Sequence, residues 1–187
     1  MRKELQVSIA PIREALQVLA AEGLAAIQLR RDVYVSNVSL LDINDLYFTR
    51  SLIEGEPIFC AVPHLSANNR ESVHGLITEM HYATDTKNIE TYIVLSRPFH
   101  LLIYSALGTQ HLLQVINTLW KRGEHYRFRY MFVTQDADRS HQEHEAILAA
   151  CQKSGQELAE QLAALHNTFT QDILREQLNK IPNRCRD

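Results

Sequence analysis

The chain has 187 residues, of which 45% are hydrophobic and 22% charged, which is the composition of a globular protein with a sizeable core. Its net charge of −3 excludes a general attraction to nucleic acid or acidic membranes. Three widely spaced cysteines indicate a reducing cytoplasm rather than a disulfide framework. The sequence shows no signal peptide and no apolar run long enough for a transmembrane helix, so we expect no membrane partner.

The first segment in chain order, residues 1–37, has the pattern of one helix followed by two short strands. Ser8 is a candidate helix N-cap and Gly23 a candidate C-cap. Strand-like runs at 26–29 and 33–35 then flank an arginine-tipped turn. This order predicts the second half of a winged helix-turn-helix whose first helix is missing. The segment is slightly basic, at net +1 against −4 for the remainder.

Residues 38–180 show helical periodicity and no strand pattern, which predicts an all-α bundle. Capping-box spacing starts the first helix at Ser39, and Pro57 is expected to kink or split it. Three more helices are predicted over residues 69–84, 88–107 and 109–132. The fold class is therefore mostly α, a partial winged helix followed by a helical bundle, with residues 181–187 as a tail.

Residues 140–169 are predicted to form a helical hairpin. Capping-box spacing starts its first helix at Ser140, and Gly155 is expected to turn the chain in a left-handed conformation. His144 lies 11 residues before this glycine and His166 lies 11 residues after it. Antiparallel packing therefore brings the two histidines to the same height, where they can share a ligand.

A third histidine, His100, lies four residues after Ser96 and so on the same helix face. Three neutral imidazoles with a vacant coordination position are typical of zinc, and nickel suits the same ligands. A lone histidine on a helix is more often a core or surface residue, so spacing alone leaves both interpretations open. His141, three residues before His144, is expected to face solvent.

The first segment resembles the DNA-binding signature of the GntR family, on the sequence VSIAPIREALQVLAAEGLAAIQLRRDVYV. The shared pattern is a serine-led helix with Pro-x-Arg-Glu-Ala-Leu, then Glu-Gly-Leu and a wing. The resemblance implies that Arg13 contacts DNA from the recognition helix, which Ser8 and Pro11 begin. It also implies phosphate contacts from Ser8 and from Arg30 or Arg31 at the wing.

The segment departs from the family pattern at two places. Ile9-Ala10 stand where the family has Arg-Thr, and Asp32 stands where the family has the glycine of the wing tip. Both changes remove groups that the family uses at DNA.

Residues 39 to about 175 resemble the FCD ligand-binding domain of the FadR subfamily of GntR regulators. The matching pieces are Leu46-Tyr47 with Arg50 and Glu54, Arg97-Pro98-Phe99-His100, Glu143-His144-Glu145-Ala146-Ile147-Leu148, and Leu165-His166. The resemblance implies that His100, His144 and His166 bind a divalent metal, zinc or nickel. Ser96 stands where the family has Asp or Asn, and its neutral hydroxyl implies weaker metal affinity.

Ser96 allows two interpretations because Pro98 follows it closely. Either the helix kinks at the proline and Ser96 is a metal ligand, or the helix begins at Pro98 and Ser96 caps it.

The resemblance further implies a small organic-acid effector, whose carboxylate is held by arginines of the bundle. Arg50, Arg122 and Tyr126 are the candidate effector-binding residues. The alternative for Arg50 is an ion pair with Glu54, four residues on, and Arg127 is then expected to be solvated.

The leading hypothesis is a cytoplasmic, homodimeric, DNA-binding regulator rather than an enzyme. The effector shifts the bundle and thereby the two heads on a near-palindromic operator. One alternative is a metal-dependent hydrolase with a three-histidine zinc site. Another is a ligand-sensing dimer that has lost DNA binding.

Overall fold

A computed structural model describes residues 8–21, 25–27, 33–35, 39–134 and 137–180. The chain divides into two compact units, Met1–Val38 and Ser39–Asp187. In the parts of the chain that are described, no helix combines the length and the apolar character needed to cross a membrane. The roles assigned to the two units from the sequence remain predictions.

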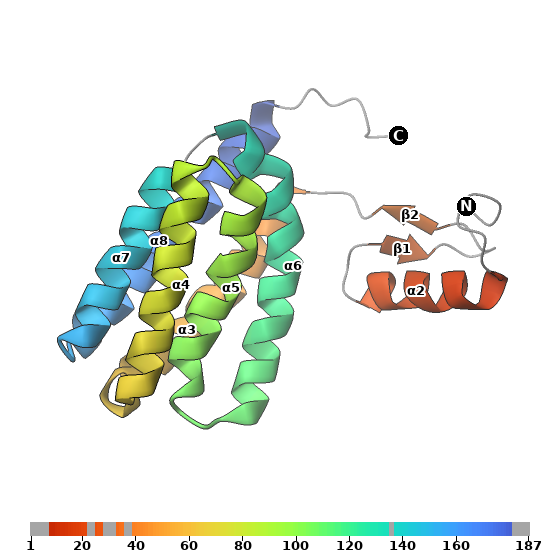
Figure 1. The fold of residues 1–187 in the computed structure, drawn as a ribbon. Helices are drawn as coiled ribbons and strands as arrows, with labels where there is room; N and C mark the ends of the chain where they lie inside the picture. Colours follow the sequence, from red (N-terminus) through yellow and green to blue (C-terminus); the bar gives the residue numbers. More distant parts are fainter. Residues whose placement is uncertain (1–7, 22–24, 28–32, 36–38, 135–136, 181–187) are drawn as a thin grey trace. The chain divides into compact units, whose positions relative to one another are not determined.

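The N-terminal unit contains α2 (Ile9–Ala21) and the antiparallel strands β1 (Ala25–Ile27) and β2 (Val33–Val35) (Figure 1). Pro11 lies in the first turn of α2, where its missing N–H breaks no helical hydrogen bond. Ala26 is opposite Tyr34 in the ladder. This is the helix and hairpin order predicted for a wing, although Gly23 and the turn at residues 30–32 lie outside the described residues.

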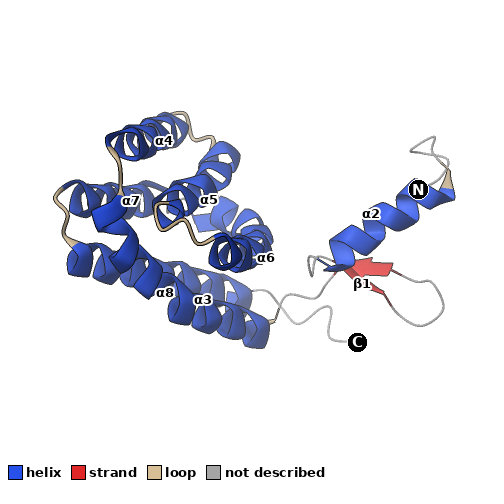
Figure 2. Cartoon of the chain, turned by 90° about the horizontal axis from the view of Figure 1, so that it is seen from below, coloured by secondary structure: helices blue, strands red, loops and turns tan. Residues whose placement is uncertain are grey.

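The second unit is a helical bundle with one short 3₁₀ turn, and the mostly α fold class is confirmed. Its elements are α3 (Leu40–Ala61), η1 (Val62–His64), α4 (Ala67–Asp85), α5 (Ile89–Ser105), α6 (Gln110–Thr134), α7 (Ala137–Gln152) and α8 (Gln156–Lys180). Figures 1 and 2 show α3 lying along α8, with α5 between α4 and α6. The α7 helix packs against both α4 and α8. One face of each helix therefore points into a shared interior.

That interior is a single apolar cluster contributed by all six long helices. Its largest fully buried apolar side chains include Trp120, Tyr92, Phe99, Ile58, Met80 and Ile103. Burying one such side chain contributes about 1.5–3 kcal/mol, so the packed interior holds the helices in register. The site described below is set into this core.

The first bundle helix begins where the sequence predicts but does not break at its proline. The Ser39 hydroxyl accepts the Asp42 N–H at 3.0 Å, which is the expected cap. The predicted split at Pro57 is wrong, since α3 continues to Ala61 with Pro57 buried in the core. Packing of the proline ring offsets the one backbone hydrogen bond that it removes.

The α7–α8 hairpin forms as predicted, but its turn uses a different residue. Ser154, not Gly155, takes the left-handed conformation, with φ at 57°. The Gly155 N–H donates to the Ala150 carbonyl at 3.0 Å and closes the end of α7. The Gly155 carbonyl accepts the Ala159 N–H at 2.9 Å, so the glycine also opens α8.

The predicted start of α7 at Ser140 is also wrong, because the helix already begins at Ala137. Ser140 is buried, and its hydroxyl oxygen accepts a hydrogen bond from Tyr92 of α5 at 2.8 Å. A contact between helices has replaced the cap that the local sequence offers.

A buried carboxylate, Glu54 of α3, joins three other side chains in the core. Its Oε1 accepts from Arg50 Nε at 2.6 Å, and its Oε2 accepts from Tyr104 at 3.1 Å and from Trp120 Nε1 at 3.2 Å. Both charges of the pair are 1% exposed. Removing one member would leave the other charge buried and uncompensated.

We expect Glu54→Ala to lower the free energy of unfolding by about 3–5 kcal/mol, because Arg50 would lose its only buried acidic partner among the described residues. Glu56→Ala is the matched control, since Glu56 is exposed on the same helix and should change stability by less than about 0.5 kcal/mol. Urea unfolding of both variants measures the difference. Equal losses would contradict a special role for the Glu54 cluster.

Candidate metal centre

Three histidines from three helices meet in the bundle interior. His100 of α5, His144 of α7 and His166 of α8 each offer a ring nitrogen, and the three nitrogens lie within 4.8 Å of one another. The Nε2 atoms of His100 and His144 are 3.1 Å apart, and the rings of His144 and His166 have centroids 4.4 Å apart. No histidine of this cluster is more than 3% exposed.

The local sequence explains how α5 delivers His100. Asn88 caps the helix by accepting the Thr91 N–H at 3.1 Å, and the helix then runs through Pro98 without ending. The capping interpretation of Ser96 is therefore wrong. The Ser96 hydroxyl instead donates to the Tyr92 carbonyl at 3.2 Å, one turn back. Its role as a fourth ligand remains a prediction.

Two of the three histidines are oriented by partners on their Nδ1 side. Glu143 Oε2 lies 2.9 Å from His166 Nδ1, so that nitrogen carries the proton and donates it. The Tyr92 hydroxyl donates to Ser140 and lies 3.0 Å from His144 Nδ1, which can therefore donate to the phenol oxygen. Both arrangements leave the lone pair on Nε2. His100 Nδ1 has no hydrogen-bond partner among the described residues.

Tyr92 was not singled out from the sequence, although a signal existed. Tyr92, Ser96 and His100 follow one another at intervals of four residues, which places them on one face of α5. In the sequence, Glu143 has capping-box spacing from Ser140 and precedes His144. In the fold it serves His166 of the facing helix.

The electrostatics of the cluster favour neutral imidazoles. Burial, and then the neighbouring His144 and His166, hold the pKa of His100 well below its usual value of 6.5. Burial followed by His166 does the same for the pKa of His144. Burial also lowers the pKa of His166, although the Glu143 carboxylate opposes it. Neutral imidazole is the form that binds a metal.

The geometry fits a divalent transition metal. Tetrahedral ligands at 2.0–2.1 Å from zinc are separated by about 3.3 Å, close to the 3.1 Å between His100 Nε2 and His144 Nε2. Within the described part of the chain, no carboxylate belongs to this group. The residues present therefore offer three nitrogen ligands, one fewer than tetrahedral zinc takes.

Two arginines border the cluster, in different states. Arg50 is paired with Glu54 and stacks on Trp120, with its Cζ 4.0 Å from the ring centroid. Arg127 of α6 stacks 4.6 Å from the same indole and is only 3% exposed. Its Nε and Nη2 have no hydrogen-bond partner among the described residues, and burial lowers its pKa. The expectation that Arg127 is solvated is wrong.

The other two residues predicted to bind the effector, Arg122 and Tyr126, are not available in the interior as predicted. Arg122 is exposed on α6, so it does not share the interior with Arg50, contrary to the prediction. The phase of α6 turns Gly123 and Arg127 inward instead. Tyr126 is buried, and its hydroxyl donates to Asp42 of α3.

The predicted DNA-binding residues belong to the other unit. Ser8, Pro11 and Arg13 are exposed at the first turns of α2. Arg30 and Arg31 lie outside the described residues. Their contacts with DNA remain predictions.

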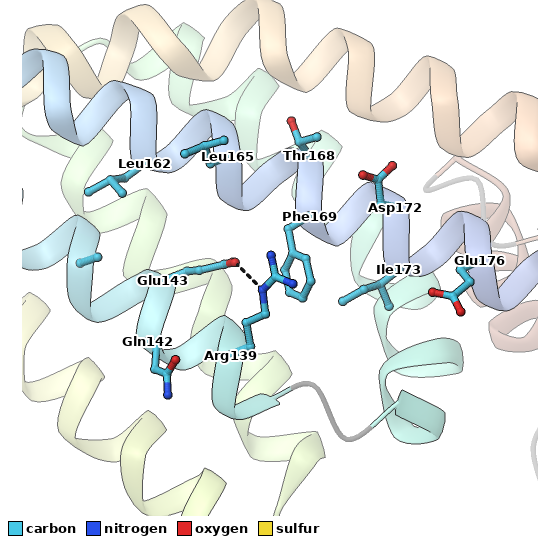
Figure 3. A pocket seen from close by; sticks show the side chains of 11 residues that line it. Arg139, Gln142, Glu143, Leu162, Leu165, Thr168, Phe169, Asp172, Ile173 and Glu176 are labelled. Atoms are coloured by element: carbon cyan, nitrogen blue, oxygen red, sulfur yellow. Dashed lines mark hydrogen bonds and ion pairs between the residues drawn. The ribbon is translucent and has the colours of Figure 1, made fainter.

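An open groove of about 670 Å³ runs along α7 and α8 outside the histidine cluster (Figure 3). In it, Arg139 points toward Glu143, with Nε 3.3 Å from Oε1, and its guanidinium lies 3.5 Å over the Phe169 ring. Glu143 thus joins this groove to His166 through its second oxygen. Glu143 therefore contacts both a lining residue of the groove, Arg139, and a histidine of the cluster.

In the metal-free chain we expect stability to fall as the pH drops below 6.5. Unfolded histidines take up protons near that value, whereas His100 and His144 stay neutral in the fold, so acid favours the unfolded state. One unit of lowered pKa corresponds to about 1.4 kcal/mol. Urea unfolding in chelator between pH 8 and 5 measures the slope. His144→Gln should reduce it, while the exposed His111→Gln should not, and an unchanged slope in His144→Gln would contradict the assignment.

Comparison with known proteins places the fold in a family. Residues 45–169 match the FCD domain model. The uncharacterized HTH-type transcriptional regulator BphR of Paraburkholderia xenovorans is 25% identical over 94% of this chain and 74% of its own length. The structure of Escherichia coli McbR/YncC superposes with a TM-score of 0.80, at 23% identity over 91% of this chain and 86% of that one. A GntR regulator from Rhodococcus sp. RHA1 gives a TM-score of 0.78, at 20% identity over 97% and 85%. The chain therefore belongs to the FCD-domain family of GntR-type transcriptional regulators.

Proposed function

We propose that this DNA-binding transcriptional regulator senses a small organic acid at a metal held by His100, His144 and His166. The observation that carries the proposal is the convergence of three buried, neutral imidazoles within the matched FCD domain. A divalent zinc or nickel ion fits this donor set. When bound, the metal supplies a positive centre that can accept a carboxylate oxygen.

The state of Arg127 supports an anionic effector. Nε and Nη2 of this buried guanidinium have no hydrogen-bond partner among the described residues, and its acidic neighbour Glu124 is paired with Arg97. A buried charge is costly unless it is paired. Its charge lowers the pKa values of His100, His144 and His166, so it acts at the site itself. A carboxylate between metal and guanidinium would offset both positive charges.

The structure changes which residues we assign to the effector. Arg50 already has Glu54 as its partner, and the Tyr126 hydroxyl already bonds Asp42. We therefore assign Arg50 and Tyr126 to the walls of the site and Arg127 to the effector carboxylate. A bidentate guanidinium suits a planar carboxylate.

The output of the sensor is expected at the N-terminal unit. Ser8, Pro11 and Arg13 of α2, with Arg30 or Arg31 at the wing, would contact a near-palindromic operator as part of a homodimer in the cytoplasm. The effector can change DNA affinity only if it binds one arrangement of the dimer more tightly than the other.

The alternatives have less support. A hydrolase needs a general base beside the metal-bound water, but the nearby carboxylate of Glu143 is shared between His166 and Arg139. The family and the named relatives are transcriptional regulators, which confirms the prediction that the chain is not an enzyme. The second alternative, a dimer that does not bind DNA, is tested by selecting random DNA sequences for binding to the protein. Such a dimer would enrich no sequence.

Zinc binding tests the metal site directly. We expect one tight zinc lost in His144→Ala, together with a rise in melting temperature on adding zinc to the wild type. Zinc at about 100 times its Kd stabilises the native state by about 2.7 kcal/mol. The exposed His111→Ala should keep both effects. Tight zinc retained by His144→Ala would contradict the assignment of the three histidines.

The effector site is tested with Arg127→Met and a panel of small mono- and dicarboxylates. Removing an unpaired buried charge should leave the unfolding free energy unchanged or higher. Loss of the charge-assisted hydrogen bonds, about 1.5–3 kcal/mol, should weaken carboxylate binding about 10- to 150-fold by calorimetry on the zinc-loaded protein. A variant that loses several kcal/mol of stability and binds acids normally would show that Arg127 is structural.

A further inference from the structure

A second histidine pair lies where α4 packs on α7, apart from the three-histidine cluster. His81 of α4 and His141 of α7 have ring centroids 5.2 Å apart, with 30° between their planes. His141 was expected to face solvent, but it is only 4% exposed. The side chain of His81 is 59% exposed, so the pair runs from the surface into the bundle.

His141 is unusual because its polar atoms are buried and unused. Neither Nδ1 nor Nε2 has a hydrogen-bond partner among the described residues. Buried ring nitrogens are normally paired, and an unsatisfied one calls for an explanation such as an ion. Among the described residues, the acidic atom within 4 Å is Glu145 Oε1, 3.5 Å from Nε2 and one helical turn further along α7.

Both helices present the same pair of donors at the same spacing. His81 and Asp85 are four residues apart on α4, and His141 and Glu145 are four residues apart on α7. The Nε2 to carboxylate distances are 3.6 Å and 3.5 Å. These are longer than good hydrogen bonds, but they are close to the roughly 3.4 Å that separates neighbouring ligands of tetrahedral zinc.

We propose that His81, Asp85, His141 and Glu145 form a second, peripheral site for a divalent transition metal that joins α4 to α7. Two imidazoles and two carboxylates are an established donor type for zinc, and the carboxylates offset the charge of the ion. In this structure no three of the four donors lie within 4.8 Å of one another. The site closes by rotation of the exposed His81, Asp85 and Glu145 side chains about the fixed His141 ring.

The peripheral site is independent of the proposed sensor but lies close to it. The Tyr92 ring lies 6.4 Å from the His141 ring and 6.0 Å from the His144 ring, centroid to centroid. Tyr92 also holds His144 Nδ1. An ion at the peripheral site would therefore stiffen the packing behind the inner cluster.

Zinc stoichiometry tests the peripheral site, measured by equilibrium dialysis and elemental analysis of the whole chain at micromolar free zinc. We expect two zinc ions per chain in the wild type and one in His81→Ala. Asp85→Asn and Glu145→Gln should weaken the second ion at least tenfold, and all three positions are exposed, so folding should be preserved. His74→Ala, at an exposed position two turns earlier on α4, is the matched control and should bind two.

The outcomes separate this site from the inner one. One zinc in the wild type that His100→Ala removes and His81→Ala retains would overturn the peripheral site and leave the sensor intact. One zinc that His81→Ala removes and His100→Ala retains would support the peripheral site and overturn the sensor. If the His81→Ala variant still binds a second zinc ion, or if the His74→Ala variant also loses it, that ion is bound elsewhere on the surface. Either result would overturn the proposal.

Discussion

Desolvation of three imidazoles at one level of the bundle is the constraint on which the site depends. Burial makes the charged form of each ring costly, and neighbouring histidines lower the pKa values of His100 and His144 further, which favours neutral imidazoles. Glu143 and the Tyr92 hydroxyl oxygen accept hydrogen bonds from Nδ1 of His166 and His144, which orients these two rings. With Nδ1 as the protonated nitrogen, the lone pairs of His144 and His166 lie on their Nε2 atoms.

The two arginines that border the cluster differ in how their guanidinium groups are partnered. On the α3 side, Glu54 neutralises Arg50 and anchors Trp120, which gives a rigid wall. On the α6 side, Arg127 also stacks on Trp120, but its Nε and Nη2 have no hydrogen-bond partner among the described residues. The Arg50–Glu54 pair stabilises the fold, whereas the positive charge of Arg127 could be neutralised by an anionic ligand. We therefore assign binding of the effector to Arg127 rather than to Arg50.

Sequence periodicity predicted the bundle and the level of the histidines, because both follow from helix geometry and from equal spacing about a turn. It failed where a contact between helices replaced a local signal. Ser140 has capping-box spacing but accepts from Tyr92 instead, and Ser154 takes the turn conformation expected of Gly155. The burial of Arg127 and His141 depends on which neighbour covers each helix face, and a single sequence does not contain that information.

The positive surroundings of the cluster have a consequence for binding order. A divalent ion between three histidines lies in the field of Arg127 and Arg50, which already lowers the affinity of these rings for a proton. The same field disfavours a bare metal ion. A carboxylate that contacts both the metal and Arg127 removes this repulsion, so metal and acid should each raise the affinity for the other by the same factor. Under the proposed function, the site would therefore bind the acid strongly only when the metal is present.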